Sequence, residues 1–273
     1  MVQLKREKIQ FPVTDKVKLL HHITKENSLF DYIEAQVFQM EAGGSYSLAL
    51  DGKEVCAVAL TGKYSISDGS VKFDEVGTRQ SVFEKVPTDS VYVPANKTIT
   101  ITCTQAGKII LCFAPASSEN RKTTFIPAGS NSIEQRGKYN NKRQVHNILD
   151  DQSTISEKLL IVEVYTSQAN WSSYPPHKHD QDNLPDESFL EEAYYHEMNA
   201  DNGFVFQRVY TDDRLIDETM TVYNEEMVLV PRGYHPVAVP DGYESYYLNI
   251  MAGPVKLWKF HNAPEYEWII SRK

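Results

Sequence analysis

The sequence contains few cysteines, no closely spaced cysteine pair and no long apolar run. Cys56, Cys103 and Cys112 are an odd number and lie far apart, which excludes a disulfide framework and a thiolate zinc site. We predict buried free thiols, because Cys103 and Cys112 flank apolar runs. No apolar run approaches the roughly 20 residues that a membrane-spanning helix needs, and the first residues lack the apolar segment of a signal peptide. We therefore expect a cytoplasmic protein that does not interact with a membrane.

Positive charge is also scarce. The 273 residues include 28 Lys and Arg against 37 Asp and Glu, a formal net charge of −9. An acidic chain without a basic stripe argues against nucleic acid as a partner. The most basic stretch, residues 136–143, is interpreted as a solvated connector.

Long helical patterns are missing, and short strand signals take their place. Residues 45–50, 55–60 and 98–102 alternate or are rich in β-branched side chains, and turns such as Asp51-Gly52 separate such runs. Regular short strands with glycine turns are typical of an all-β sandwich or barrel.

The two halves of the chain repeat one local pattern. Residues 86–96 end a strand at a proline turn, and residues 225–235 do the same but add a histidine. The economical interpretation is a pair of jelly-roll β-barrels related by an internal repeat. We predict a first barrel without a metal site over residues 1–120, a connector over residues 121–155, and a second barrel with a metal site over residues 156–273.

Candidate metal ligands are confined to the second half. His177 and His179 are two residues apart, so on an extended strand they share a face and Lys178 points the other way. Glu192 and His235 follow in strand-like runs. Three imidazoles and one carboxylate that converge on a cavity would bind a divalent ion, and such ligands suit Zn, Mn, Fe, Co or Ni without choosing among them.

Five blocks of sequence surround these residues. They are NWSSYPPHKHD at residues 170–180, LEEAYY at 190–195, GFVFQRVYTDD at 203–213, VPRGYHPV at 230–237 and YYLNIMAGP at 246–254. In this order they resemble the 5-deoxy-glucuronate isomerase family of myo-inositol catabolism. Thinner similarity at residues 79–83 and 92–94 extends the resemblance over nearly the whole chain.

The resemblance implies a bicupin, with a divalent metal in the second barrel held by His177, His179, Glu192 and His235. It also implies an aldose–ketose isomerase of carbohydrate metabolism that interconverts 5-deoxy-D-glucuronate and 2-deoxy-5-keto-D-gluconate. Glu191 competes with Glu192, but adjacent strand residues cannot both face inward, and the resemblance favours Glu192. Glu191 is then expected to be a solvated charge.

The resemblance is imperfect at two positions. Ala169 stands where the family tends to have glycine, and His196 stands where another aromatic or polar residue is expected. Neither position is a ligand.

The remaining candidates concern proton transfer and the sugar acid substrate. The base could be Tyr194, His196 or a hydroxide on the metal, and the sequence does not decide among them. Arg208 is the first candidate to meet the substrate carboxylate, since its guanidinium fork suits that group. Tyr247 and Asn249 share strand parity and could bind sugar hydroxyls.

Other functions stay open at this stage. A cupin oxygenase that uses Fe(II) needs a similar ligand set, and the fold also allows a non-catalytic sugar-binding cupin. Exposed strand edges and an aromatic-rich C-terminus are compatible with a homo-oligomer.

Overall fold

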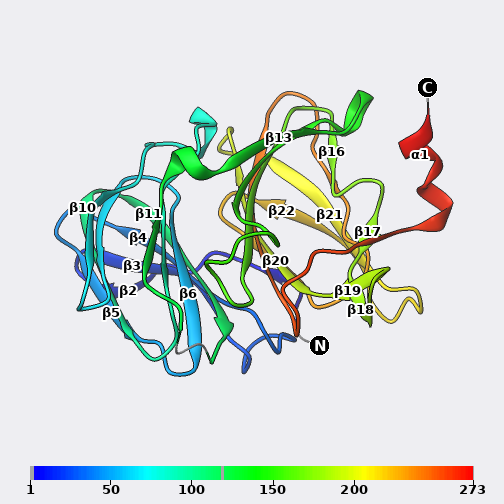
Figure 1. Cartoon of the computed structure of the whole chain (residues 1–273). Helices are drawn as coiled ribbons and strands as arrows, with labels where there is room; N and C mark the ends of the chain where they lie inside the picture. Colours follow the sequence, from blue (N-terminus) through cyan, green and yellow to red (C-terminus); the bar gives the residue numbers. More distant parts are fainter. Residues whose placement is uncertain (1–2, 118–119, 273) are drawn as a thin grey trace. The chain divides into compact units, whose positions relative to one another are not determined.

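The computed structural model describes residues 3–117 and 120–272 and consists mainly of antiparallel strands (Figure 1). The all-β prediction is confirmed. None of the helices in the described ranges is long and apolar enough to cross a membrane. All three cysteines are buried and free, as predicted.

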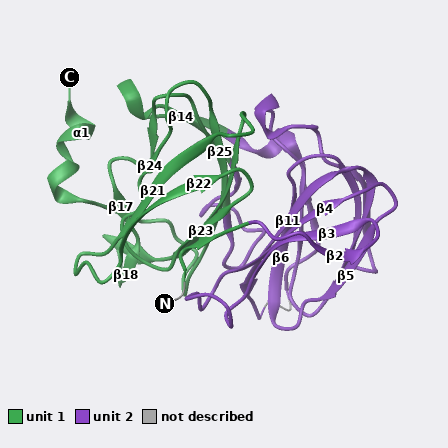
Figure 2. Cartoon of the chain, turned by 180° about the vertical axis from the view of Figure 1, so that it is seen from behind, with its two compact units in different colours: residues 1–7, 133–146, 161–273 green, residues 8–132, 147–160 purple. Residues whose placement is uncertain are grey.

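The described residues form two compact units (Figure 2). One comprises residues 8–132 and 147–160, and the other comprises residues 1–7, 133–146 and 161–273. Each unit contains one seven-stranded and one four-stranded sheet.

The unit that includes residues 8–132 has two sheets. The strand order of the larger sheet is β12 (Thr124–Ile126), β9 (Ser90–Val93), β6 (Lys53–Ala59), β11 (Gly107–Pro115), β4 (Glu34–Met40), β3 (Val17–Ile23) and β2 (Phe11–Thr14). That of the smaller sheet is β5 (Ser45–Ala49), β10 (Thr98–Gln105), β7 (Lys63–Ser67) and β8 (Lys72–Val76). Two 3-10 turns accompany them, η1 (Val82–Glu84) and η2 (Ala128–Ser130).

The core of this unit follows from alternation along the strands. On β10, Ile99, Ile101 and Cys103 are buried while the threonines between them are partly or fully exposed. These three side chains join Val55 and Val91 of the larger sheet in one hydrophobic cluster. The two sheets of this unit therefore pack face to face through alternate residues.

The other unit repeats the plan. Its larger sheet has the order β1 (Lys5–Arg6), β23 (Met227–Val230), β20 (Glu191–Met198), β25 (Ser245–Ala252), β15 (Leu160–Thr166), β14 (Arg143–Leu149) and β13 (Ser132–Arg136). The smaller sheet has the order β16 (Trp171–Ser172), β24 (Val237–Ala238), β21 (Phe204–Tyr210) and β22 (Asp217–Tyr223). Two short pairs complete it, β17 (His177–Lys178) with β26 (His261–Asn262) and β18 (Asp180–Asn183) with β19 (Glu187–Phe189). The helical turns are η3 (Tyr139–Asn141), η4 (Pro264–Tyr266) and α1 (Trp268–Ser271).

The proline corners hold equivalent places in the two units. Pro94 lies between β9 of a larger sheet and β10 of a smaller one, and Pro231 lies between β23 and β24 in the same way. The corner after β23 carries His235. Because β23 pairs with β20, this corner brings the histidine close to β20.

Candidate metal centre

The candidate metal centre is built on one face of β20. Glu192, Tyr194 and His196 alternate with residues of the opposite face, where the Tyr195 hydroxyl donates to Glu197 at 3.0 Å. Glu192 faces Val230 at the end of β23, so the corner that follows brings His235 to this carboxylate.

Glu192 is the acid that joins the histidines, and Glu191 is not part of the group. The expectation that Glu191 is a solvated charge is wrong, because the residue is only 2% exposed. Parity separates the two acids as predicted, but the strand is buried on both faces, as central strands of packed sheets are.

Three side chains converge at the centre: His179, Glu192 and His235. Glu192 Oε2 lies 2.9 Å from Nε2 of His179 and 3.0 Å from Nε2 of His235. One ligand atom from each residue lies within 4.8 Å of the others, and each residue is at most 2% exposed. Within the described ranges, these are the His, Cys, Asp and Glu side chains that form a group of three fit for a metal ion.

Backbone carbonyls fix which nitrogen of each ring faces the carboxylate. Nδ1 of His179 lies 2.8 Å from the Leu190 carbonyl, and Nδ1 of His235 lies 2.8 Å from the Gly233 carbonyl. A carbonyl can only accept, so each Nδ1 carries a hydrogen and a neutral ring leaves its Nε2 lone pair free. Hydrogen bonds of this kind hold the rings of metal-binding histidines in a fixed orientation.

The donor atoms fit a divalent cation. A carboxylate oxygen and a bare imidazole nitrogen are both acceptors, so a proton or a cation must lie between them. Nε2 of His235 makes no hydrogen bond of normal geometry despite its distance from Glu192, which leaves a buried lone pair directed at the centre. Two imidazoles and a carboxylate with further positions open suit a catalytic ion.

The charges within the group act on one another. Burial alone would raise the pKa of Glu192, but His235 and His179 outweigh it and hold that pKa far below its usual range. Burial likewise opposes protonation of His179, but the hydrogen bond and charge of Glu192 raise its pKa. The carboxylate is therefore ionised at neutral pH.

His177 lies beside the group rather than within it. Its ring centroid is 4.9 Å from that of His235, 6.3 Å from that of His179 and 4.8 Å from that of Phe260. Burial and the two neighbouring histidines hold the pKa of His177 well below its ordinary value, so the ring is neutral. The regular strand assumed from the sequence is absent, since β17 ends at Lys178 and β18 begins at Asp180.

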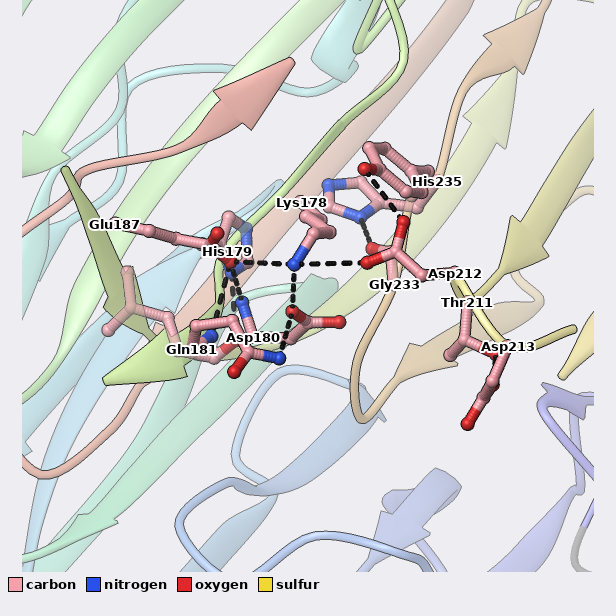
Figure 3. A network of polar contacts seen from close by, with 12 residues as sticks. Lys178, His179, Asp180, Gln181, Glu187, Thr211, Asp212, Asp213, Gly233 and His235 are labelled. Atoms are coloured by element: carbon pink, nitrogen blue, oxygen red, sulfur yellow. Dashed lines mark hydrogen bonds and ion pairs between the residues drawn. The ribbon is translucent and has the colours of Figure 1, made fainter. Parts of the chain in front are cut away.

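Lys178 anchors the segment that carries the two histidines (Figure 3). Its ammonium lies 2.6 Å from Asp180, 3.3 Å from Glu187 and 3.5 Å from Asp212. Only 4% of Lys178 is exposed, so it is buried among acids and does not point into solvent. The backbone N–H of Asp180 also donates to Glu187 at 2.7 Å, which ties the chain after His179 to β19.

A group of polar side chains, the interior wall, lines the inside of this unit next to the centre. It consists of Ser173, Tyr194, Tyr247 and Asn249. The hydroxyls of Tyr194 and Ser173 lie 3.0 Å apart, and the Tyr247 ring centroid is 4.9 Å from that of Tyr194. Tyr194 faces Asn249 in the β20–β25 register. Nδ2 of Asn249 is buried without a hydrogen-bond partner among the described residues. The structure thus brings Tyr194, Tyr247 and Asn249 to one interior face.

His196 extends this wall further from the centre. Its ring stacks on that of Tyr194 at 5.7 Å with an interplanar angle of 14°, and its Nε2 lies 2.9 Å from Oε1 of Gln207 on β21. Gln207 was not predicted to be a site residue from the sequence. Adjacent residues on a strand face opposite ways, so only one of Gln207 and Arg208 can face inward, and this rule could have indicated Gln207 as the alternative.

The structure does not bring Arg208 to this face. Arg208 lies on the opposite side of β21 from Gln207, where its guanidinium pairs with Asp217 through two contacts of 2.8 Å. It lines a surface pocket of about 250 Å³ together with Trp171 and Tyr266. The expected contact with the substrate carboxylate is therefore not supported, because parity directs Arg208 outward.

Arg143 belongs to the basic stretch that the sequence predicts to be a solvated connector. It begins β14, its side chain is partly buried, and its Nη1 donates to the carbonyl of Tyr174, three residues before His177. The solvated interpretation holds for this residue only in part, because Arg143 begins a strand and its side chain is partly buried.

Comparisons with known proteins identify the family of this chain. Residues 7–269 match the model of the KduI/IolB family. The chain is 54% identical over 272 residues to a protein of Bacillus subtilis (strain 168) named 5-deoxy-glucuronate isomerase, covering 100% of both chains. It is 58% identical over 257 residues to the protein of that name from Bacillus licheniformis, covering 94% of each.

Solved structures support the fold. An IolB-like protein from Salmonella typhimurium LT2 superposes with a TM-score of 0.92 at 40% identity, over 98% of this chain and 99% of that one. Oxalate decarboxylase from Lactobacillus farciminis superposes with a TM-score of 0.69 at 9% identity, over 100% and 91%. The likeness to this bicupin confirms the predicted fold of two jelly-roll barrels. The extent of the family match and the identity to its members show that the chain belongs to the KduI/IolB family.

Proposed function

We propose that this protein is a metal-dependent isomerase that converts 5-deoxy-D-glucuronate to 2-deoxy-5-keto-D-gluconate. The observation that carries the proposal is the buried His179–Glu192–His235 group, in a chain that matches proteins named 5-deoxy-glucuronate isomerase along its length. Family membership favours this isomerase over an oxygenase or a binding protein.

We assign the metal to His179, Glu192 and His235, with His177 as the fourth ligand. His177 qualifies because its neutral ring packs against His235 at the edge of the group. A divalent ion held there supplies a Lewis acid for the substrate carbonyl and the neighbouring hydroxyl.

The interior wall provides groups that can hold or accept protons. Burial and the charge of Glu192 raise the pKa of Tyr194 well above its ordinary value, so its hydroxyl stays protonated and can donate to a sugar oxygen. Burial lowers the pKa of His196 to about 4, so its ring is neutral and Nδ1 is free to accept. We assign proton donation to Tyr194 and sugar hydroxyl binding to Tyr247 and Asn249.

The second barrel, which in the structure comprises residues 1–7, 133–146 and 161–273, is the one we propose to be catalytic. The group of three ligands lies in this barrel, and none of its members comes from the described residues of the other one, residues 8–132 and 147–160. Free buried thiols suit a reducing cytoplasm, where we place the enzyme. Homo-oligomer formation stays a prediction.

The test is turnover of the metal-loaded protein. Incubation with 5-deoxy-glucuronate should produce the ketose, followed by NMR, and elemental analysis of protein purified without chelator should identify the ion. Glu192→Gln should lose both metal and turnover, whereas Glu191→Gln, on the opposite face, should retain metal. Absence of turnover with Zn, Mn, Fe and Co alike would overturn the proposal.

A further inference from the structure

Arg143 is a partly buried cation for which the structure shows no acidic partner among the described residues. Its Nη1 donates to the carbonyl oxygens of Asn141 at 2.9 Å and Tyr174 at 3.4 Å. Among the described residues, no carboxylate forms an ion pair with it. Arg136 and Arg208, by contrast, each pair with an acid, Glu134 and Asp217 respectively.

Partial burial of a cation without an anion is unfavourable. Transfer of a charge out of water is unfavourable unless an opposite charge or several hydrogen bonds compensate for it. Burial lowers the pKa of Arg143, yet a guanidinium does not give up its proton in proteins. The two carbonyls engage only Nη1, and neither Nε nor Nη2 is among the buried atoms without a partner, so these two donors remain accessible to an anion.

The surroundings of Arg143 place that anion beside the candidate metal centre. The Tyr174 carbonyl that accepts from Arg143 belongs to the residue three positions before His177, and the hydroxyl of the preceding residue, Ser173, lies 3.0 Å from that of Tyr194 in the interior wall. A uronate has its reacting carbonyl at one end of the carbon chain and its carboxylate at the other. Recognition therefore needs a cation next to the centre rather than within it.

We propose that Arg143 binds the carboxylate of the substrate and thereby selects sugar acids over neutral sugars. The proposal rests on the proposed function. The guanidinium fork matches a planar carboxylate with two parallel hydrogen bonds, and a low-dielectric interior strengthens such a pair. Lys178 cannot serve this purpose, because three carboxylates already surround its ammonium.

The experiment compares an acid with its neutral counterpart. Wild type, Arg143→Met and Arg143→Lys are assayed with 5-deoxy-glucuronate and with its methyl ester, and metal content is measured for each. Arg143→Met should raise KM for the acid by about 10- to 100-fold and change that for the ester by less than about threefold, since it removes charged hydrogen bonds to the carboxylate alone. Arg143→Lys should restore part of the loss, because it keeps the charge but not the fork.

Arg214→Met is the matched control, because Arg214 is exposed and pairs with Asp217 on the surface. Equal losses for acid and ester, or loss of metal from Arg143→Met, would overturn the proposal by showing that the guanidinium only holds the Tyr174 carbonyl. Unchanged kinetics in Arg143→Met, or selective loss of acid turnover in Arg208→Met instead, would also overturn it.

Failure of the proposed function has a different signature. If wild type converts neither compound, calorimetric titration of both into wild type and Arg143→Met still decides the point. Tighter binding of the acid than of the ester in wild type, lost in the variant, supports the carboxylate role, and equal binding overturns it.

Discussion

His196 and Gln207 face each other across the interior of their unit, with Nε2 of the imidazole 2.9 Å from Oε1 of the amide. The amide oxygen only accepts, so Nε2 of His196 carries the proton. Nδ1 is buried without a hydrogen-bond partner in the described part of the chain. A ring held in this way is maintained in its neutral form.

The neutral state of His196 should appear as a pH dependence of stability. Burial lowers its pKa to about 4, below the value of about 6.5 for an unfolded histidine. The stabilisation is complete above pH 6.5 and is lost as pH falls from there towards 4, because the unfolded chain then binds the extra proton. At pH 5 the loss is about 2 kcal/mol. Urea unfolding should be measured at pH 7.5 and pH 5. The decrease in the free energy of unfolding between these pH values should be about 2 kcal/mol smaller for His196→Gln than for wild type. Equal losses in both proteins would contradict the assignment.

Alternation along a strand made part of the site predictable. Glu192, Tyr194 and His196 could be assigned to one face from sequence, because side chains two apart on a strand point the same way. The same rule separated Glu191 from Glu192. The rule also implies that the neighbours Gln207 and Arg208 face opposite ways, but only the packing of β21 shows which of them faces inward.

Other parts of the site depend on contacts that are distant in sequence. Arg143 lies in a polar stretch that looks like any solvated loop, and its burial follows from the strand it begins and from the Tyr174 carbonyl 31 residues away. His177 and His179 depart from the expected strand because Lys178 draws the chain toward Asp180 and Glu187. The spacing of residues in the sequence does not predict such contacts.

Lys178 should be important for both stability and metal binding. Lys178→Met leaves the buried acids Asp180 and Glu187 without their cation, at a cost of about 3–5 kcal/mol in the free energy of unfolding. Displacement of the His179 segment should weaken metal affinity about 10- to 100-fold. Chemical denaturation and titration with a metal-sensitive dye measure the two effects. Lys63→Met, which breaks the exposed pair with Glu75, is the control and should cost less than about 1 kcal/mol. A similar cost for both variants would refute the anchoring role.

The hydroxyl of Tyr194 should be needed for turnover but not for metal binding. Tyr194→Phe keeps the ring that packs against His235 and Tyr247 and removes only the proton donor. We expect kcat to fall about 10²- to 10⁴-fold with unchanged metal content. Tyr195→Phe is a close control, because its hydroxyl bonds Glu197 on the opposite face of β20. If the two variants lose the same fraction of activity, Tyr194 has no special part in proton transfer.

Gly233 should be irreplaceable at the corner that presents His235. Its φ is +95°, and a Cβ at this position would lie 2.5 Å from the carbonyl oxygen of Tyr210. Gly233→Ala must therefore shift the backbone whose carbonyl accepts the His235 Nδ1–H. Gly242 has a similar φ of +103° with no atom within 4 Å of the added methyl group, so Gly242→Ala carries only the conformational cost of about 1–2 kcal/mol.

The two glycine variants separate strain from steric overlap. Thermal unfolding should show a larger loss of stability for Gly233→Ala than for Gly242→Ala, and metal analysis should show depletion in Gly233→Ala alone. The reason is geometric: strain at either glycine destabilises its loop, but only movement of the Gly233 carbonyl frees the His235 ring to rotate. Full metal content in Gly233→Ala would mean that this carbonyl is not what orients the ligand.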